Sequence, residues 1–418
     1  MLGDKMSLAN SWRRCIGVAI ATGLSFASVP GHAQEQFAHP PSYTFDAGPG
    51  LGELETSAAF AGYFFDQSGA GNGSTVGNYS TGFRVNAWEV EVARPVNMGN
   101  IWGFGIQAAE YQDINLGLNA PKTVNDNRFQ TGPIRSAYFA LAPAPGFKLS
   151  VGQLDSLEGF ESVFPWNNPS MLRTAVNPGQ NSDSKGVELD YANGPYAGSL
   201  MFSDGYDTNV FNYFTWLGTA KFDANNELSV YGGTHFGSTG PDAFAYGEGG
   251  MPSGGPFGVG GQHQLAVVNS TMIGAWYTWR YGNLSVIPEL QYQFTPALRR
   301  YAADTSGGVS DDIPGYTSAF VAALFGIYRI PNTHFSISGW VNYGTSNGTG
   351  PQDVWFAAPN QKLVGLAIAP AWKYNPVYVR LNFGYAHLLN LGTPISGYGS
   401  TGTQRNTVIG TLEFGLVF

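Results

Sequence analysis

The chain ends in the stretch Thr407–Phe418, TVIGTLEFGLVF, and this stretch decides the fold class. Its larger apolar side chains share one face of an extended strand: Val408, Leu412, Phe414, Leu416 and Phe418. The opposite face holds mostly polar or small residues, among them Thr407, Thr411, Glu413 and Gly415. A period of two indicates a β-strand whose two faces meet different surroundings. A strand of about ten residues also has the length that crosses a lipid bilayer when it is tilted.

The same period recurs upstream of this segment, as in Leu284–Phe294 and Val377–Tyr385. Strand-like runs are expected near residues 55–67, 83–96, 101–113, 133–143, 147–155, 185–193, 196–205, 214–223, 227–237, 271–281, 284–294, 316–330, 334–346, 362–373, 377–389 and 407–418. Seven tight turns and eight long loops alternate between these sixteen runs. That alternation predicts an even-stranded barrel whose two ends lie on the side of the short turns.

Composition supports a barrel that spans a membrane. Of 418 residues, 43% are hydrophobic, only 12% are charged and 57 are glycines, and the net charge is −9. So little charge argues against a disordered chain, and an acidic chain without a basic patch argues against nucleic-acid binding. Within lipid, strands pair every backbone group only when they close into a barrel. We therefore expect an all-β fold, a transmembrane antiparallel β-barrel of about 16 strands with short periplasmic turns and long external loops.

The N-terminal residues have the three zones of a secretory signal peptide. Basic residues (Lys5, Arg13 and Arg14) precede an apolar stretch over 16–29, and small residues precede Gln34. We divide the chain into a signal peptide (1–33), a short N-terminal segment (34–54) and the barrel (55–418). Cleavage would remove the only cysteine and with it any thiolate ligand, and the remaining histidines are scattered. No metal and no cofactor is therefore expected.

Two stretches resemble known outer-membrane proteins. The run Val151–Glu161, continued through Pro165-Trp166-Asn167-Asn168 to Arg173, resembles the OmpL-like β-barrel porin family, although Gln153 stands where that family often has lysine. The ending Phe414, Leu416 and Phe418 resembles the signal that the barrel-assembly machinery recognises. These resemblances imply a passive pore in the outer membrane of a Gram-negative bacterium.

A pore needs a constriction with fixed charges, and the third long loop, 156–184, is the candidate. The candidate residues are Asp155, Glu158, Glu161, Arg173, Asp183 and Lys185, of which the first and last stand at the strand ends. In general porins the third long loop folds into the lumen, and this chain resembles them in loop order and size. The alternative is an ordinary external loop that covers the mouth of the barrel.

Strand alternation also predicts which charges face the lumen. These are Glu89, Glu91, Glu188, Asp190, Glu289 and Glu413, against the basic Arg280 and Arg380. A ring of carboxylates lowers the energy of a cation in a narrow wet passage and raises that of an anion. The sequence therefore predicts a mild preference for cations.

The expected function is passive diffusion of small hydrophilic solutes or ions through a barrel that contacts outer-membrane lipid, with no enzymatic activity. A homo-oligomer is compatible with such a barrel. One alternative is an outer-membrane hydrolase of the phospholipase kind, because His334 and Ser336 have the spacing of that family's pair. A second alternative is an exported soluble β-sandwich that binds a ligand.

Overall fold

The computed structural model describes residues 37–38, 40–69, 81–116, 124–126, 133–240, 265–298, 313–348, 360–392, 397–399 and 401–418. The expected signal peptide, 1–33, lies outside the described residues. Among those residues α2 (Leu265–Val268) is the one α-helix, and no helix is long and apolar enough to cross a membrane.

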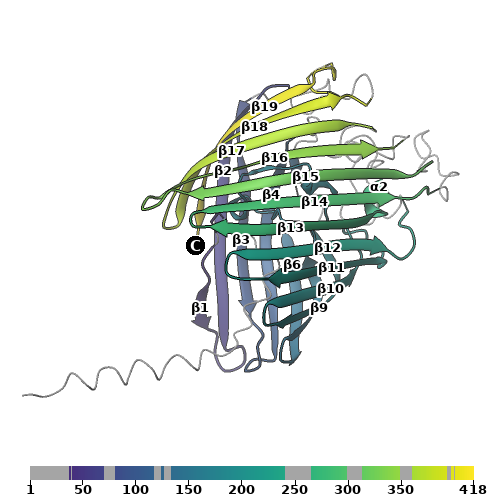
Figure 1. The fold of residues 1–418 in the computed structure, drawn as a ribbon. Helices are drawn as coiled ribbons and strands as arrows, with labels where there is room; N and C mark the ends of the chain where they lie inside the picture. Colours follow the sequence, from purple (N-terminus) through teal and green to yellow (C-terminus); the bar gives the residue numbers. More distant parts are fainter. Residues whose placement is uncertain are drawn as a thin grey trace, which may run out of the picture.

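Sixteen strands form one closed antiparallel barrel (Figure 1). They are β2 (Glu53–Gln67), β3 (Thr81–Arg94), β4 (Trp102–Asn115), β6 (Ile134–Ala144), β7 (Phe147–Asp155), β9 (Asp183–Asn193), β10 (Tyr196–Ser203), β11 (Tyr213–Lys221), β12 (Asn226–His235), β13 (Thr271–Tyr281), β14 (Leu284–Thr295), β15 (Thr317–Arg329), β16 (Phe335–Asn347), β17 (Lys362–Tyr374), β18 (Val377–Asn390) and β19 (Asn406–Val417). The predicted barrel is confirmed, and the β-sandwich alternative is wrong. Seven short connections lie at one end, the short-turn end, and eight long ones at the other.

The barrel closes where the last strand pairs with the first. The register of β19 on β2 runs from Ile409 opposite Gln67 to Val417 opposite Ala59. On the N-terminal side of the β2 residues that pair with β19, the strand β1 (Tyr43–Asp46) pairs with the start of β2, at Glu53–Thr56. In Figure 1, β1 lies beside the lower part of β2, close to the C-terminus. The sequence patterns did not predict this strand, which lengthens the wall at the short-turn end.

The two faces of the C-terminal strand differ as its pattern predicts. Leu412 is 44% exposed, whereas its neighbour Glu413 is fully buried. The exposed face is apolar and suits lipid, and the other face points into the barrel. In the 83–96 run, the pattern loses its phase because the register of β3 on β2 shifts opposite Ala61 and Gly62, a β-bulge.

The long connection between β7 and β9, residues 156–182, is described throughout. It contains two short 3-10 turns, η2 (Pro165–Asn167) and η3 (Asn177–Gly179), and the strand β8 (Leu172–Arg173). β8 pairs in parallel with the end of β4, while β5 (Val124–Asp126) pairs with the same strand in antiparallel fashion. We call residues 156–182 the inner loop.

Candidate functional site

The inner loop crosses the interior of the barrel and is hydrogen-bonded to the opposite wall. The backbone N–H of Phe160 donates to Glu289 Oε1 on β14 (3.1 Å). Met171 N–H donates to Asn382 Oδ1 on β18 (3.1 Å). The indole of Trp340 on β16 donates to the carbonyl of Leu172 (2.7 Å). These three wall residues face inward, so the loop lies inside the barrel and does not cover its mouth.

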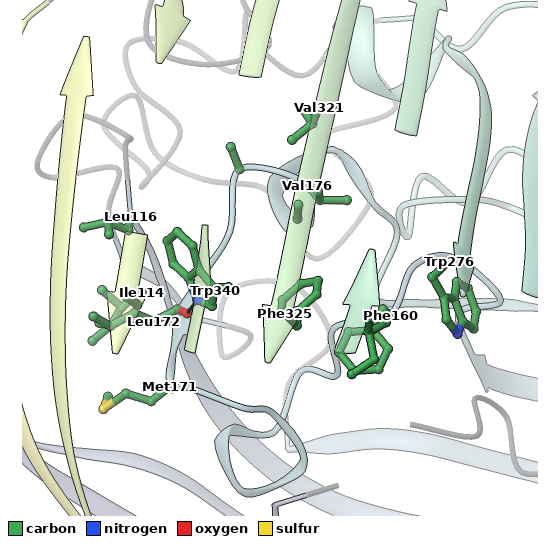
Figure 2. Close-up of a cluster of buried hydrophobic side chains, with 14 of the residues drawn as sticks. Ile114, Leu116, Phe160, Met171, Leu172, Val176, Trp276, Val321, Phe325 and Trp340 are labelled. Carbon is green, nitrogen blue, oxygen red and sulfur yellow. Dashed lines mark hydrogen bonds between the residues drawn. The ribbon is translucent and has the colours of Figure 1, made fainter. Parts of the chain in front are cut away.

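Apolar packing holds the same loop in place (Figure 2). Phe160 stacks obliquely on Phe325 of β15, with ring centroids 4.8 Å apart. Leu172 lies against Trp340, and Val176 lies near Val321, as Figure 2 shows. Each large apolar side chain buried in this way contributes about 1.5–3 kcal/mol. The loop is therefore a fixed part of the barrel interior.

The two carboxylates of the loop accept hydrogen bonds that hold the loop in its conformation. Glu158 accepts a hydrogen bond from the Tyr213 hydroxyl (2.5 Å) and another from the Asn181 N–H (2.7 Å). Burial raises the pKa of Glu158 to about 7. Glu161 accepts hydrogen bonds from the backbone N–H (3.1 Å) and the hydroxyl of Thr174. Both carboxylates are buried. Glu161 stabilises the loop itself, and Glu158 also joins the loop to Tyr213 on β11.

The other predicted constriction residues lie in two places. Arg173 is buried and donates to the carbonyl of Val163 (2.7 Å), within the loop. Asp155 forms an ion pair with Arg135 (2.5 Å) at the end of β7. Lys185 reaches Asp207 (3.4 Å) beyond β10. Asp183 is fully buried and accepts a hydrogen bond from Gln153 Nε2 (3.4 Å). The structure thus groups Glu158, Glu161 and Arg173 in the loop. It brings Asp155 and Asp183 together as cross-strand partners where β7 ends and β9 begins, with Lys185 two residues further along β9.

An ion pair on the opposite wall is hydrogen-bonded to the inner loop. Arg380 of β18 and Glu413 of β19 are both fully buried and lie 2.8 Å apart. The remaining guanidinium N–H groups donate to the carbonyls of Asn168 (2.7 Å) and Pro165 (2.8 Å), at the η2 turn. This one arginine therefore ties two wall strands to the loop.

The remaining predicted lumen charges point inward, but most are buried. Glu89 accepts a hydrogen bond from Gln107 (2.9 Å), Glu289 from the Tyr231 hydroxyl (2.9 Å), and Asp190 forms an ion pair with Lys148 (2.9 Å). Glu188 is also buried, whereas Glu91 and Arg280 are half-buried. The sequence reasoning missed the tyrosine, glutamine and lysine partners, although strand alternation could have placed them on the inward face.

A family model described as "Putative beta-barrel porin-2, OmpL-like" matches residues 54–418. The chain belongs to this porin family. The resemblance found in the sequence is thereby confirmed. No curated protein matches the chain.

The porin's fold is similar to that of several solved outer-membrane proteins. The anion-selective porin from Comamonas acidovorans has a TM-score of 0.55 at 8% identity, and the match covers 87% of this chain and 99% of that one. OmpT of Vibrio cholerae, in its in-vitro folded form, has a TM-score of 0.50 at 8% identity, over 89% and 99%. Salmonella typhi OmpF in complex with daunomycin has a TM-score of 0.50 at 11% identity, over 88% and 98%. At these identities the likeness is one of fold alone.

The porin's own N-terminal segment also enters the barrel. The N–H of Ala38 donates to the carbonyl of Trp166 in the inner loop (2.7 Å). The Phe37 ring lies edge-on to Tyr378, with centroids 5.4 Å apart, and the Arg380 guanidinium lies 4.8 Å from the centre of the same ring. We call Phe37 and Ala38 the N-terminal strap. The sequence patterns did not predict this contact, because the segment has no periodic pattern.

The described contacts of His334 and Ser336 give no support to the hydrolase alternative. The His334 ring packs edge-on against Tyr374, with centroids 4.8 Å apart, and Ser336 lies beside it on β16 at the short-turn end. Within the described ranges, no three His, Cys, Asp or Glu side chains lie close enough together to hold a metal ion.

Proposed function

We propose that this protein is a passive diffusion channel for small hydrophilic solutes, located in the outer membrane of a Gram-negative bacterium and without enzymatic activity. The observation that carries the proposal is a closed sixteen-stranded barrel with the inner loop folded across its interior. A barrel of this size encloses more space than its own wall side chains fill. The inner loop then narrows that space to a constriction.

The proposed path runs from the long loops, past the inner loop, to the short turns. At the short-turn end the inward side chains are polar and half-buried, as at Lys148, Thr219, Arg280, Ser336 and Lys373. Polar walls let a solute keep its hydration shell or replace it with side-chain contacts. The mechanism needs no conformational cycle, because the driving force is the solute's own concentration gradient.

The predicted cation preference depended on carboxylates that face water. Glu188, Asp190, Glu289 and Glu413 are buried against the loop, the wall or a basic partner, which counts against that preference. A buried, paired carboxylate attracts a passing cation less than an exposed one does. We therefore do not extend the proposal to cation selectivity.

Three further expectations stay predictions: cleavage of a signal peptide at Ala33, folding by the barrel-assembly machinery and association into oligomers. A solved form of Vibrio cholerae OmpT is described as a trimer. Cross-linking of the purified barrel in detergent would test association for this chain.

The channel itself is tested in planar lipid bilayers. Purified, folded protein should give stepwise increases in current, because each inserted barrel adds one water-filled path. Folding is checked beforehand by the faster gel migration of the unheated barrel. Folded protein that inserts without conducting would refute the proposal.

The N-terminal strap should narrow the channel. Deletion of residues 34–40 removes the hydrogen bond from Ala38 to Trp166 and the Phe37 ring that packs on Tyr378. We expect single-channel conductance to rise about twofold, since conduction follows the open cross-section of the pore. Tyr43→Ala is the control, because Tyr43 lies on β1 with its side chain exposed. Equal conductance in the deletion variant and the wild type would contradict this prediction.

A further inference from the structure

Three columns of outward-facing side chains end in polar residues at the long-loop end of the barrel. The columns belong to the neighbouring strands β17, β18 and β19, which lie side by side in the wall (Figure 1). Their exposed apolar members include Leu366, Ile368, Leu381, Phe383 and Leu412. Alternation along each strand carries the same face to Lys362 on β17, His387 on β18 and Asn406 on β19. The outer surface therefore changes from apolar to polar at these three residues.

This change occurs at one level in the register of the strands. Val364 on β17 and Asn406 on β19 both lie opposite His387, and Lys362 stands two residues beyond Val364 toward the long loops. The Tyr385 hydroxyl and Nδ1 of His387 both contact Asn406 Oδ1, at 2.7 Å each. Tyrosine is enriched where the hydrocarbon of a bilayer gives way to its headgroups. The polar ends of the three columns thus stand at the level of the headgroups.

Two cations flank the end of β18 at this level. The backbone N–H of Lys362 donates to Asn390 Oδ1 (2.6 Å). On the other side, Arg405 Nη1 donates to the carbonyl of Leu389 (3.2 Å). Both basic side chains are exposed, and they lie about 10 Å apart, because neighbouring strands are about 4.8 Å apart. We define the rim patch as the residues Lys362, His387, Arg405 and Asn406.

Carboxylates are scarce around the rim patch. No Asp or Glu occurs in the sequence segments that carry it, 360–368, 383–392 and 401–412. Within the described part of the chain, neither of its two cations forms an ion pair with a carboxylate. On the adjoining β2, Asp66 is exposed opposite Gly410, four residues along β19 from Asn406, or about 13 Å. That separation exceeds the Debye length of about 8 Å in physiological salt, so the patch keeps its positive charge.

We propose that the rim patch binds the phosphate group of an anionic lipid in the leaflet on the long-loop side. Ammonium and guanidinium groups form charge-assisted hydrogen bonds with phosphate oxygens, and the side-chain N–H groups of Asn406 add neutral donors. The occupant is a lipid because Lys362 continues the column of Leu366, which faces acyl chains, so one molecule contacts both. The inference rests on the proposed function, since that function places the barrel in a membrane.

The test is lipid binding by the folded barrel, measured by native mass spectrometry in detergent micelles. Phosphatidylglycerol has a net negative headgroup, whereas phosphatidylcholine balances the same phosphate with a cation. The wild type should bind phosphatidylglycerol at least about tenfold more tightly. The double variant Lys362→Gln, Arg405→Gln should lose about 25-fold in that affinity, since each basic side chain near an anionic lipid contributes about fivefold. Lys362→Arg with Arg405→Lys keeps both charges, so the preference for phosphatidylglycerol should survive.

Lys221→Gln is the matched control, because it removes an exposed cation at the short-turn end and should leave the affinity unchanged. An excess of inorganic phosphate should not displace the lipid. Heat-dependent gel mobility confirms that each variant has closed its barrel. The inference is overturned by equal binding of the two lipids, by a double variant that binds like the wild type, or by displacement with inorganic phosphate. Folded wild type that conducts no ions would instead overturn the proposed function and leave lipid binding as measured.

Discussion

Replacing Arg380 with methionine is expected to destabilise the barrel by about 3–5 kcal/mol. The substitution leaves Glu413 fully buried without its partner at 2.8 Å, and a buried unpaired carboxylate costs several kcal/mol. It also removes the donors to the carbonyls of Pro165 and Asn168, which fix the η2 turn of the inner loop. The folded band on an unheated gel should therefore disappear at a lower temperature than in the wild type.

Two further variants separate the charge effect from lost packing. Arg405→Met makes the same change at an exposed arginine of the loop that follows β18, so its melting should match the wild type. Arg380→Met combined with Glu413→Leu removes both charges and should recover much of the lost stability. The account of the ion pair is wrong if the single variant melts like the wild type.

Raising the pH through about 7 is expected to loosen the inner loop. Burial raises the pKa of Glu158 to about 7, whereas a released loop would return it to about 4.5. The inserted loop therefore has its full stability below about pH 4.5 and loses it progressively up to about pH 7. The difference amounts to about 3 kcal/mol, or roughly a hundredfold in the equilibrium between inserted and released loop.

Single-channel recordings across this pH range measure release of the inner loop. As the pH rises, steps to a higher conductance should become more frequent. Glu158→Gln cannot ionise, and its amide can still meet the Tyr213 hydroxyl, so its conductance should not depend on pH in this way. Glu53→Gln removes an exposed carboxylate at the start of β2 and should keep the behaviour of the wild type. A pH response that persists in Glu158→Gln would assign the titration to another group.

Much of the fold follows from the sequence because the information is local. A strand that faces lipid on one side must alternate, and Leu412, Glu413 and Phe414 show this within three residues. Turn residues such as Gly282-Asn283 mark strand ends without reference to distant parts of the chain. These two signals predict the number of strands, their faces and the closure of the barrel.

The candidate site was only partly predictable, because its contacts join distant segments. Nothing near Phe160 in the sequence points to Glu289, and nothing near Met171 points to Asn382. The N-terminal strap was missed for the same reason, since Ala38 contacts Trp166 only after the barrel has closed around both.

The sequence by itself determined the barrel, its porin family and the inward face of its charges, since strand alternation and motifs are read from neighbouring residues. Only the tertiary structure decided which of those charges meet water. The inner loop and paired side chains bury Glu289, Glu413 and Asp190, while Arg329 and Lys373 stay accessible. A charge that is buried and paired loses most of its influence on a passing ion. Which inward charges meet water therefore follows from packing, which a count of charges along the strands does not contain.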